Sequence, residues 1–457
     1  MLSPAIFKAN DIRGVATGPH PEWDEAGARA LGLAYGHLLG PGATVVVSRD
    51  MRPTGPALQA AFTDGLTRQG VNAILAGLSS TDQLWFDSGF LDLPGAQFTA
   101  SHNPATYNGL KFCRAQAQPV SPEFLVDLAE LAQRYDRGEL APDVTLAPGS
   151  VTERDLLGDY AAYLHQLVPL QGRRHFKVVV DAGNGMAGHT VPAVLGPLDV
   201  EVVGLYLDLD GNFPNHEPNP LVPANRVDAQ NAVKATGADL ALIFDGDADR
   251  CFVIDERGET VSPSAITALI AVAELQREPG ATIVINTITS DAVREIVAEH
   301  GGQTVESRVG HTYVKAEMAR HHAIFGGEHS AHYYFRDFWG ADTGLLAGLH
   351  VLAQLDASDG PLSELVAAYT RYVASGEINS TVTDAPATMA HVAAAFAGRG
   401  EARWGDGVKV VGPGWWFNLR PSNTEPLLRL NVEATSADQM AGLRDEVLDL
   451  VHSKETA

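Results

Sequence analysis

The chain has 457 residues, of which 56 are acidic and 32 basic, so its formal net charge is −24. This length predicts roughly three or four domains, because single hydrophobic cores rarely serve more than about 250 residues. So acidic a surface would repel phosphate backbones and anionic lipids, which argues against a nucleic-acid or membrane partner. Two cysteines, Cys113 and Cys251, exclude a disulfide framework, and Lys8 and Asp11 come too early for a signal peptide, so we expect a cytoplasmic protein.

Strand-like and helix-like segments alternate over residues 1–370. The strand-like segments include ATVVVSRD (43–50), FKVVVDAG (176–183), ADLALIFDGD (238–247) and GATIVINT (280–287). Helical patterns such as DAVREIVAEH (291–300) stand between them. This alternation predicts α/β domains with mainly parallel sheets. We expect three related ones, over residues 1–147, 148–255 and 256–370.

The pattern changes in the last part of the chain. VKVVG (408–412), WWFNLR (415–420) and LLRLNVEA (427–434) have strand composition and follow one another closely, and a helical pattern then begins at residue 437. This order predicts a smaller α+β domain over residues 371–457. The expected fold class is therefore α/β with a smaller C-terminal α+β domain.

Three apolar runs each end in a concentrated polar loop: AQFTASHNP (96–104), LALIFDGDADR (240–250) and HAIFGGEHSAH (322–332). In parallel α/β sheets, ligands bind outside the carboxyl ends of the strands. The three loops are therefore expected to line one shared cleft, with NLRPSNTEP (418–426) as its other wall.

The loop DGDADR places Asp245, Asp247 and Asp249 at alternate positions after an apolar strand. Three carboxylates so close together repel one another unless a cation neutralises them, and oxygen ligands favour Mg²⁺ or Ca²⁺. The spacing also begins a calcium-binding EF-hand loop, but Arg250 stands where that loop needs glycine, and strands flank it. We therefore predict a metal site, with Arg250 placed for a nearby phosphate.

A second motif, DAGNGMAG (181–188), matches the glycine pattern of a dinucleotide-binding turn, and Asp208 lies at the expected distance along the chain. An NAD-dependent dehydrogenase is therefore an alternative hypothesis. Close packing of a helix on a strand explains the same glycines, and a dehydrogenase has no need of three aspartates and a Ser-His-Asn loop.

Three further segments carry candidate binding groups. GGEHSAH holds Glu328, His329, Ser330 and His332, a set that suits sugar hydroxyls better than zinc because no further ligand stands at zinc spacing. SRVGHTYVK contributes Arg308, His311 and Lys315. LRPSNTEP sets Arg420, Ser422, Asn423 and Thr424 around a proline turn, which suits a phosphate.

Taken in order, the motifs FKANDIRG, TASHNP, NGLKF, DAGNGMAG, DGNFPNHEPNP, DGDADR, VGHTYVK, GEHSAH and RPSNTEP resemble those of the α-D-phosphohexomutase superfamily, and specifically its bacterial phosphomannomutases. The resemblance covers almost the whole chain. It implies four domains around a central cleft and an enzyme that moves a phosphoryl group between two positions of a hexose, acting on mannose and in some members also on glucose.

The resemblance also implies roles for individual residues. Ser101 would carry the phosphoryl group and, with Asp245, Asp247 and Asp249, hold one Mg²⁺. Lys111 and His311 would handle protons, and His102 would shape the loop. Arg250 would steady the transferring group, and Arg13 and Lys8 would add positive potential beside Ser101. Glu328 and Ser330 would hold ring hydroxyls, while Arg308, Arg420, Ser422, Asn423 and Thr424 would hold phosphate.

A hexose 1,6-bisphosphate is the intermediate and activator that the resemblance implies, and a monomer or weak homodimer is expected. Two departures from the family pattern are Asn10, where tyrosine is common, and Ile288, where a basic residue is common. Two other functions stay open: a phosphoglucosamine mutase, and a non-catalytic sugar-phosphate sensor, which would have no use for a phosphoryl carrier.

Overall fold

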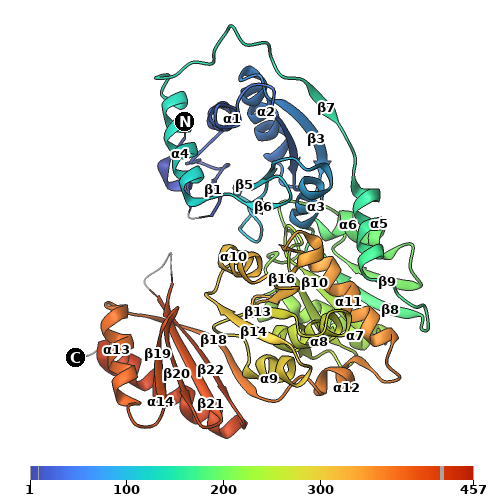
Figure 1. Ribbon diagram of the computed structural model, residues 1–457, viewed down its shortest axis with the longest axis vertical. Helices are drawn as coiled ribbons and strands as arrows, with labels where there is room; N and C mark the ends of the chain where they lie inside the picture. Colours follow the sequence, from blue (N-terminus) through green and yellow to red (C-terminus); the bar gives the residue numbers. More distant parts are fainter. Residues whose placement is uncertain (1, 9, 423–426, 456–457) are drawn as a thin grey trace. The chain divides into compact units, whose positions relative to one another are not determined.

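The computed structural model in Figure 1 describes residues 2–8, 10–422 and 427–455. It divides into two compact units. The first unit comprises residues 1–261 and 330–363, and the second comprises 262–329 and 364–457. Helix α12 (Leu362–Ala367) lies where the chain passes from the first to the second.

The first unit begins with a seven-stranded mixed sheet. Its spatial order is β1 (Ile12–Val15), β5 (Tyr107–Arg114), β4 (Gly95–Phe98), β2 (Thr44–Arg49), β3 (Asn72–Leu78) and β7 (Val151–Glu153), with β6 (Gln118–Pro119) beside β5. Strand β2 runs parallel to β3 and β4, whereas β5 is antiparallel to β4 and β1. The helices of this part are α1 (Glu25–Leu39), α2 (Gly55–Arg68), α3 (Thr81–Leu91) and α4 (Pro122–Asp136), preceded by the 3₁₀ turn η1 (Pro4–Ile6). Aromatic side chains including Tyr35, Phe62 and Phe98 fill the core between sheet and helices.

A second, five-stranded sheet follows in the same unit. Its order is β12 (Thr260–Val261), β11 (Cys251–Asp255), β10 (Leu240–Phe244), β8 (Phe176–Asp181) and β9 (Val200–Leu205). The strands β10, β8 and β9 are parallel, and the β10–β11 pair is antiparallel because a short loop joins them. Helices α5 (Leu157–Leu167), α6 (Ala187–Leu195) and α7 (Val227–Thr236), with η2 (Pro223–Arg226), belong to this part. The unit also holds β16 (Tyr333–Phe335), η3 (Arg336–Phe338), β17 (Ala341–Asp342) and α11 (Gly344–Asp356).

The second unit contains the parallel strands β14 (Gln303–Ser307), β13 (Thr282–Asn286) and β15 (Phe325–Gly327), with β13 in the middle. Helices α8 (Pro263–Arg277), α9 (Asp291–Glu299) and α10 (His311–His321) accompany them. Its C-terminal part is an antiparallel sheet in the order β18 (Val373–Thr381), β22 (Leu427–Ala434), β21 (Trp415–Pro421), β20 (Gly407–Gly412), β19 (Glu401–Gly405). Helices α13 (Ala385–Ala395) and α14 (Ala437–Glu455) pack on this sheet, drawn in orange and red in Figure 1.

The predicted fold class, α/β with a smaller C-terminal α+β part, is confirmed. One detail differs. The seven-stranded sheet and the sheet that contains β10 are mixed, because β5 and β11 return along their neighbours through short loops instead of crossing over by a helix. Both strands directly follow predicted polar loops, so in each case the polar loop is the turn at which the chain reverses. Among helices of the described residues, none combines the length and the apolar character needed to cross a membrane.

A buried carboxyl, Asp82, joins three elements of the first unit. Its side chain lies in α3 and accepts hydrogen bonds from Ser80, from Tyr160 of α5 at 2.6 Å and from Thr343 at 2.7 Å. Burial raises the pKa of Asp82 to about 6, although the three hydroxyl groups oppose the rise. The folded protein therefore binds this proton more tightly than the unfolded chain does.

Because the folded pKa is raised, the stability linked to this proton is fully present below about pH 4 and is lost as the pH rises through about 6. We expect the wild-type melting temperature, relative to that of Asp82→Asn, to fall between pH 4 and 7 and then stay level. Thermal unfolding of both proteins across this range measures the difference. A difference that did not change with pH would show that Asp82 is ionised throughout.

Candidate active site

Ser101 lies on the loop between β4 and β5, at the end of the first sheet. It is 5% exposed, and its backbone adopts a left-handed conformation with φ of 49°, which is uncommon for a residue other than glycine. Its Oγ lies 3.2 Å from Asp245 Oδ2 and 3.2 Å from His102 Nδ1. The predicted serine loop and the predicted aspartate loop thus meet within the first unit.

The three aspartates occupy the short loop between β10 and β11, with Ala248 in the left-handed region at φ of 61°. Asp245 and Asp247 are fully buried and Asp249 is 3% exposed. One oxygen from each carboxylate lies within 4.8 Å of the others, a spacing that a single cation bridges. The strands on both sides agree with the rejection of an EF-hand, whose loop joins two helices.

Two cations balance this buried acidic group. Lys111 Nζ, on β5, lies 2.7 Å from Asp247 Oδ2 and 2.9 Å from Asp249 Oδ2. Burial alone would lower the pKa of Lys111, but the two carboxylates raise it above its ordinary value, so the ammonium form is held. Arg250 Nε donates to Asp245 Oδ2 at 2.8 Å. Burial raises the pKa of Asp245, and the positive charge of Arg250 offsets only part of this rise.

His102 is held as a neutral imidazole. Burial, followed by the charges of Arg250 and Arg13, places its pKa well below the ordinary value. Arg250 Nη2 lies 2.6 Å from His102 Nδ1, and since a guanidinium can only donate, Nδ1 is the acceptor. The proton of the ring is therefore on Nε2, and the Ser101 hydroxyl is left to donate to Asp245.

The residues of this loop fit a divalent cation. Asp247 Oδ1 is buried and has no hydrogen-bond partner among the described residues, which is costly for a carboxylate oxygen unless another group completes its shell. The donors are carboxylate oxygens with a hydroxyl beside them, a hard set that suits Mg²⁺ better than a soft metal. Asp245, Asp247, Asp249 and Ser101 would hold such an ion.

His332 belongs beside this cluster, although the sequence motif alone gave it no role. Its Nε2 lies 3.5 Å from Asp249 Oδ1, and its Nδ1 is 2.9 Å from Ser330 Oγ. Burial opposes protonation, but the hydrogen bond and charge of Asp249 outweigh it and raise the pKa of His332. The backbone bridge between Arg250 and His332 explains how two distant loops meet, which no local pattern reveals.

The glycines of the dinucleotide-like motif have a packing role. A Cβ on Gly185 would lie 2.6 Å from the carbonyl oxygen of Gly246, in the aspartate loop, and a Cβ on Gly188 would lie 2.0 Å from the carbonyl oxygen of Leu207. The Met186 amide also donates to the Gly246 carbonyl at 2.9 Å. The motif therefore supports the aspartate loop, which removes the main observation behind the dehydrogenase hypothesis.

Of the two N-terminal cations, Arg13 contacts the serine loop, whereas Lys8 makes its hydrogen bond to the N-terminal segment. Arg13 Nη1 donates to Asn103 Oδ1 at 2.8 Å and Nη2 donates to Asp11 at 2.6 Å. Lys8 is exposed and donates to the carbonyl of Ala5 at 2.6 Å. The role predicted for Lys8 therefore has no contact in its support.

In the second unit, two predicted segments meet at Glu328. This carboxylate is 2% exposed and follows β15. Its Oε1 accepts from the Gly310 amide at 3.0 Å and from Asn286 Nδ2 at 3.3 Å. Because Gly310 directly precedes His311, the first residue of α10, the structure brings His311 and Glu328 to the same region. The Arg308 guanidinium lies 4.9 Å from the ring centroid of Tyr313.

Arg420, at the end of β21, is 7% exposed and pairs with Glu377. Arg429 Nη1 lies 3.5 Å from the same carboxylate and its Nη2 lies 3.4 Å from Ser422 Oγ, so a second guanidinium stands at the predicted phosphate cradle. Sequence reasoning missed Arg429 because it lies on the next strand, opposite Arg420 in the register. Asn423 and Thr424 lie outside the described residues.

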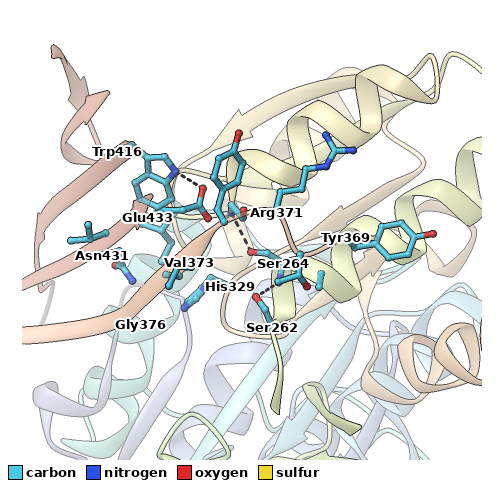
Figure 2. Close-up of a pocket in the computed structure, with 17 residues that line it drawn as sticks. Ser262, Ser264, His329, Tyr369, Arg371, Val373, Gly376, Trp416, Asn431 and Glu433 are labelled. Carbon is cyan, nitrogen blue, oxygen red and sulfur yellow. Dashed lines mark hydrogen bonds between the residues drawn. The ribbon is translucent and has the colours of Figure 1, made fainter. Parts of the chain in front are cut away.

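A separate pocket, drawn in Figure 2, is lined by residues of the second unit. Its walls include Trp416, Glu433 and the segment 369–374, with Trp416 Nε1 donating to Glu433 at 2.8 Å. Ile288, the position where a basic residue is common in the family, lines this pocket and is 5% exposed. Of the predicted sugar-binding residues in GGEHSAH, His329 lines this pocket, whereas Glu328 and Ser330 do not.

The fold and the serine–aspartate site define a multidomain α/β protein in which a serine hydroxyl lies beside an acidic cluster that could hold a metal ion. Family models of the phosphoglucomutase/phosphomannomutase α/β/α domains I, II and III match residues 4–139, 159–258 and 262–372, and that of the C-terminal domain matches 377–450. The chain belongs to the phosphoglucomutase/phosphomannomutase family.

Relatives of known name cover nearly the whole chain. It is 38% identical to a phosphomannomutase of Salmonella montevideo, over 99% of this chain and 100% of the relative. Proteins named phosphohexose mutases from Xanthomonas campestris are 39% identical over 95% of both chains. A solved phosphoglucomutase/phosphomannomutase family protein from Burkholderia thailandensis matches with a TM-score of 0.88 and 32% identity, covering 99% of this chain and 98% of the other.

Proposed function

We propose that the protein is a phosphomannomutase that interconverts mannose 6-phosphate and mannose 1-phosphate and also accepts glucose phosphates. The observation that carries the proposal is the contact of Ser101 Oγ with Asp245 at 3.2 Å. Asp245 belongs to an acidic cluster that pairs with Arg250 and Lys111, and the neutral ring of His102 lies beside Ser101. Family membership and relatives named phosphomannomutase support the same conclusion.

In the proposed reaction, phosphorylated Ser101 gives its phosphoryl group to the free hydroxyl of a hexose phosphate. The bond between Ser101 Oγ and phosphorus breaks, the sugar oxygen bonds to phosphorus, the sugar hydroxyl loses its proton, and the released Ser101 Oγ takes one up. The product of this step is a hexose 1,6-bisphosphate. After the sugar turns over, Ser101 Oγ loses its proton and bonds to the other phosphoryl group, and the sugar oxygen that is released takes up a proton.

The chain supplies charge and orientation for both steps. A Mg²⁺ held by Asp245, Asp247, Asp249 and Ser101 would neutralise charge on the transferring phosphoryl group. Arg250 and the ammonium of Lys111 add fixed positive charge to the aspartate cluster that Ser101 contacts, and Arg13 steadies the loop through Asn103. His311 is the proposed proton-transfer group of the second unit.

Substrate contacts are proposed for the second unit and for Ser330. Glu328 and Ser330 hold ring hydroxyls, whereas Arg308, Arg420, Ser422, Asn423 and Thr424 hold the phosphate that does not react. Arg429, close to Ser422, joins this set. Because this set binds a phosphate and not the sugar ring, it can accept either the 1-phosphate or the 6-phosphate of the hexose.

The remaining proposals concern the setting of the enzyme. We propose four domains over 1–147, 148–255, 256–370 and 371–457, a monomer or weak homodimer, and hexose 1,6-bisphosphate as activator. Two cysteines, Cys113 and Cys251, are too few for a disulfide framework, which favours the reducing cytoplasm.

The test is a coupled assay of the purified protein with mannose 1-phosphate, glucose 1-phosphate and glucosamine 1-phosphate. We expect kcat/KM to be highest for mannose 1-phosphate, with measurable turnover of glucose 1-phosphate. A preference for glucosamine 1-phosphate would establish the alternative, a phosphoglucosamine mutase. Binding of all three without turnover would indicate a sugar-phosphate sensor.

Replacing Arg420 by alanine tests the phosphate cradle. A charge-assisted hydrogen bond contributes about 1.5–3 kcal/mol, so kcat/KM should fall roughly 10- to 100-fold. The loss should be similar for mannose and glucose 1-phosphates, because the cradle does not contact the sugar ring. Arg403→Ala, which removes an exposed guanidinium paired with Glu401 in the same sheet, is the matched control and should leave kcat/KM unchanged. Unchanged kinetics in Arg420→Ala would refute this phosphate site.

A further inference from the structure

Arg52 is a fully buried arginine, 1% exposed, on the segment that follows β2. Its guanidinium contacts no group that takes part in the proposed reaction. Instead it donates to the main chain of the serine loop. Nη2 donates to the carbonyls of Ser101 at 2.9 Å and Asn103 at 2.7 Å, and Nη1 donates to those of Pro104 at 2.8 Å and Tyr107 at 2.9 Å. One side chain therefore binds four carbonyls, three in the loop and one at the start of β5.

The amide of Ser101 is held within its own loop, where it donates to Thr99 Oγ1 at 3.0 Å. Arg52 is itself held by Asp50, whose Oδ1 accepts a hydrogen bond from the Arg52 amide at 2.9 Å and whose Oδ2 lies 3.3 Å from Arg52 Nε. Thr99 thus binds the N–H of Ser101, and Arg52 binds its C=O.

These contacts bear on the backbone of Ser101 in particular. Its φ of 49° is disfavoured for serine and persists only when the surrounding structure imposes it. Since both peptide units flanking Ser101 are planar and are tied at defined points, the rotation about its backbone bonds is restricted. This conformation is the one that directs Oγ to Asp245 and His102.

The motif DGNFPNHEPNP, which the proposed reaction leaves without a role, braces the other side of Arg52. The guanidinium lies over the ring of Phe213, 5.2 Å from its centroid. A Cβ on Gly211 would lie 2.6 Å from Arg52 Cα and 2.7 Å from Pro53 Cδ, so the motif's backbone packs directly on this segment. Both elements belong to the first unit.

We infer that Arg52, braced by Phe213 and paired with Asp50, is a positioning residue that, together with Thr99, holds Ser101 in the conformation needed for phosphoryl transfer. The inference rests on the proposed function of Ser101. A planar fork of five donors is required, because four carbonyls converge on it; the three donors of a lysine ammonium spread from a single nitrogen and cannot reach them all. A positioning defect should slow phosphoryl transfer without weakening substrate binding to the same degree.

The test compares Arg52→Lys and Thr99→Val with the wild-type enzyme. Wild-type turnover and phosphorylation of Ser101 are measured first, and their absence would refute the proposed function and not this inference. In each variant we expect kcat to fall at least about tenfold while KM changes less than about threefold. The rate at which hexose 1,6-bisphosphate phosphorylates Ser101, followed by intact mass, should fall in parallel.

Arg174→Lys is the matched control. Arg174 also donates to main-chain carbonyls, of Leu355 and Gly360, pairs with Asp239 and lies 5.2 Å from the ring centroid of Phe176. Its loss should affect the melting temperature with kcat unchanged. Equal kcat in Arg52→Lys and Arg174→Lys, once each is expressed per folded enzyme, would overturn the inference.

The double variant Arg52→Lys/Thr99→Val adds a readout that does not depend on the size of either effect. If both residues act by holding Ser101, the decrease in kcat should be clearly smaller than the product of the two single decreases. Multiplicative effects would mean that the two residues act independently and would overturn the inference. If Arg52→Lys does not fold, Thr99→Val decides: reduced kcat at an unchanged KM supports the positioning role, and unchanged kcat refutes it.

Discussion

Ser101→Ala should lower kcat by about a thousandfold or more, because it removes the nucleophile through which both half-reactions pass. The variant should retain the aspartate cluster and its contacts with Lys111, since the Ser101 side chain takes part in neither ion pair. Steady-state assays in both directions, together with the melting temperature, measure the effect.

The control for this prediction is Ser121→Ala. Ser121 caps α4 by accepting a hydrogen bond from the Phe124 amide, so its loss should cost about 1 kcal/mol of stability and no activity. Mass analysis of the wild-type enzyme should find the phosphate on the peptide that contains Ser101. Phosphate found only elsewhere, or an active Ser101→Ala protein, would remove Ser101 from the reaction.

The second large effect concerns the metal. Chelation should abolish turnover and Mg²⁺ should restore it. Asp247→Asn should lower kcat about a hundredfold and raise the Mg²⁺ concentration needed for half activity, because one anionic oxygen ligand is lost. Titrations of activity and of melting temperature with Mg²⁺ give two independent measurements, since an ion that binds only the folded state stabilises it.

Asp228→Asn is the matched control for the metal prediction. Asp228 is exposed and accepts a hydrogen bond from Tyr206 at 2.8 Å. Activity of the Asp228→Asn variant should therefore respond to Mg²⁺ as that of the wild type does. Full turnover in excess chelator, with the three aspartates intact, would show that the aspartate loop has another purpose.

Much of the fold and the centre of the site could be predicted from local pattern. The alternation of strands and helices predicted the α/β class, and the change after residue 370 predicted the last sheet. Asp245, Asp247 and Asp249 are adjacent in the chain, so their grouping needed no knowledge of the fold. The prediction that the polar loops at strand ends lie together anticipated the contact between Ser101 and Asp245, whose loops follow strands of two different sheets.

The residues that sequence reasoning missed act across long separations in the chain. Arg52 stands 49 positions before the Ser101 carbonyl that it binds, and an arginine after a strand has no distinctive local signal. His332 meets Asp249 because two loops pair through a single backbone bridge, and Arg429 meets Ser422 across a strand pair. The sequence contained the family motif DGNFPNHEPNP, but it did not reveal that Phe213 packs against the Arg52 guanidinium.

The sequence by itself determined the chemical groups: the serine, the three carboxylates, the lysine and the arginines, each attached to a recognisable strand end. Only the tertiary structure decided what each group faces. It showed that Asp247 and Asp249 pair with Lys111, that the dinucleotide-like glycines support the aspartate loop, and that buried Arg52 holds the Ser101 backbone. The physical reason is that side-chain chemistry is local, whereas burial and hydrogen-bond partners depend on segments that become neighbours only when the chain folds.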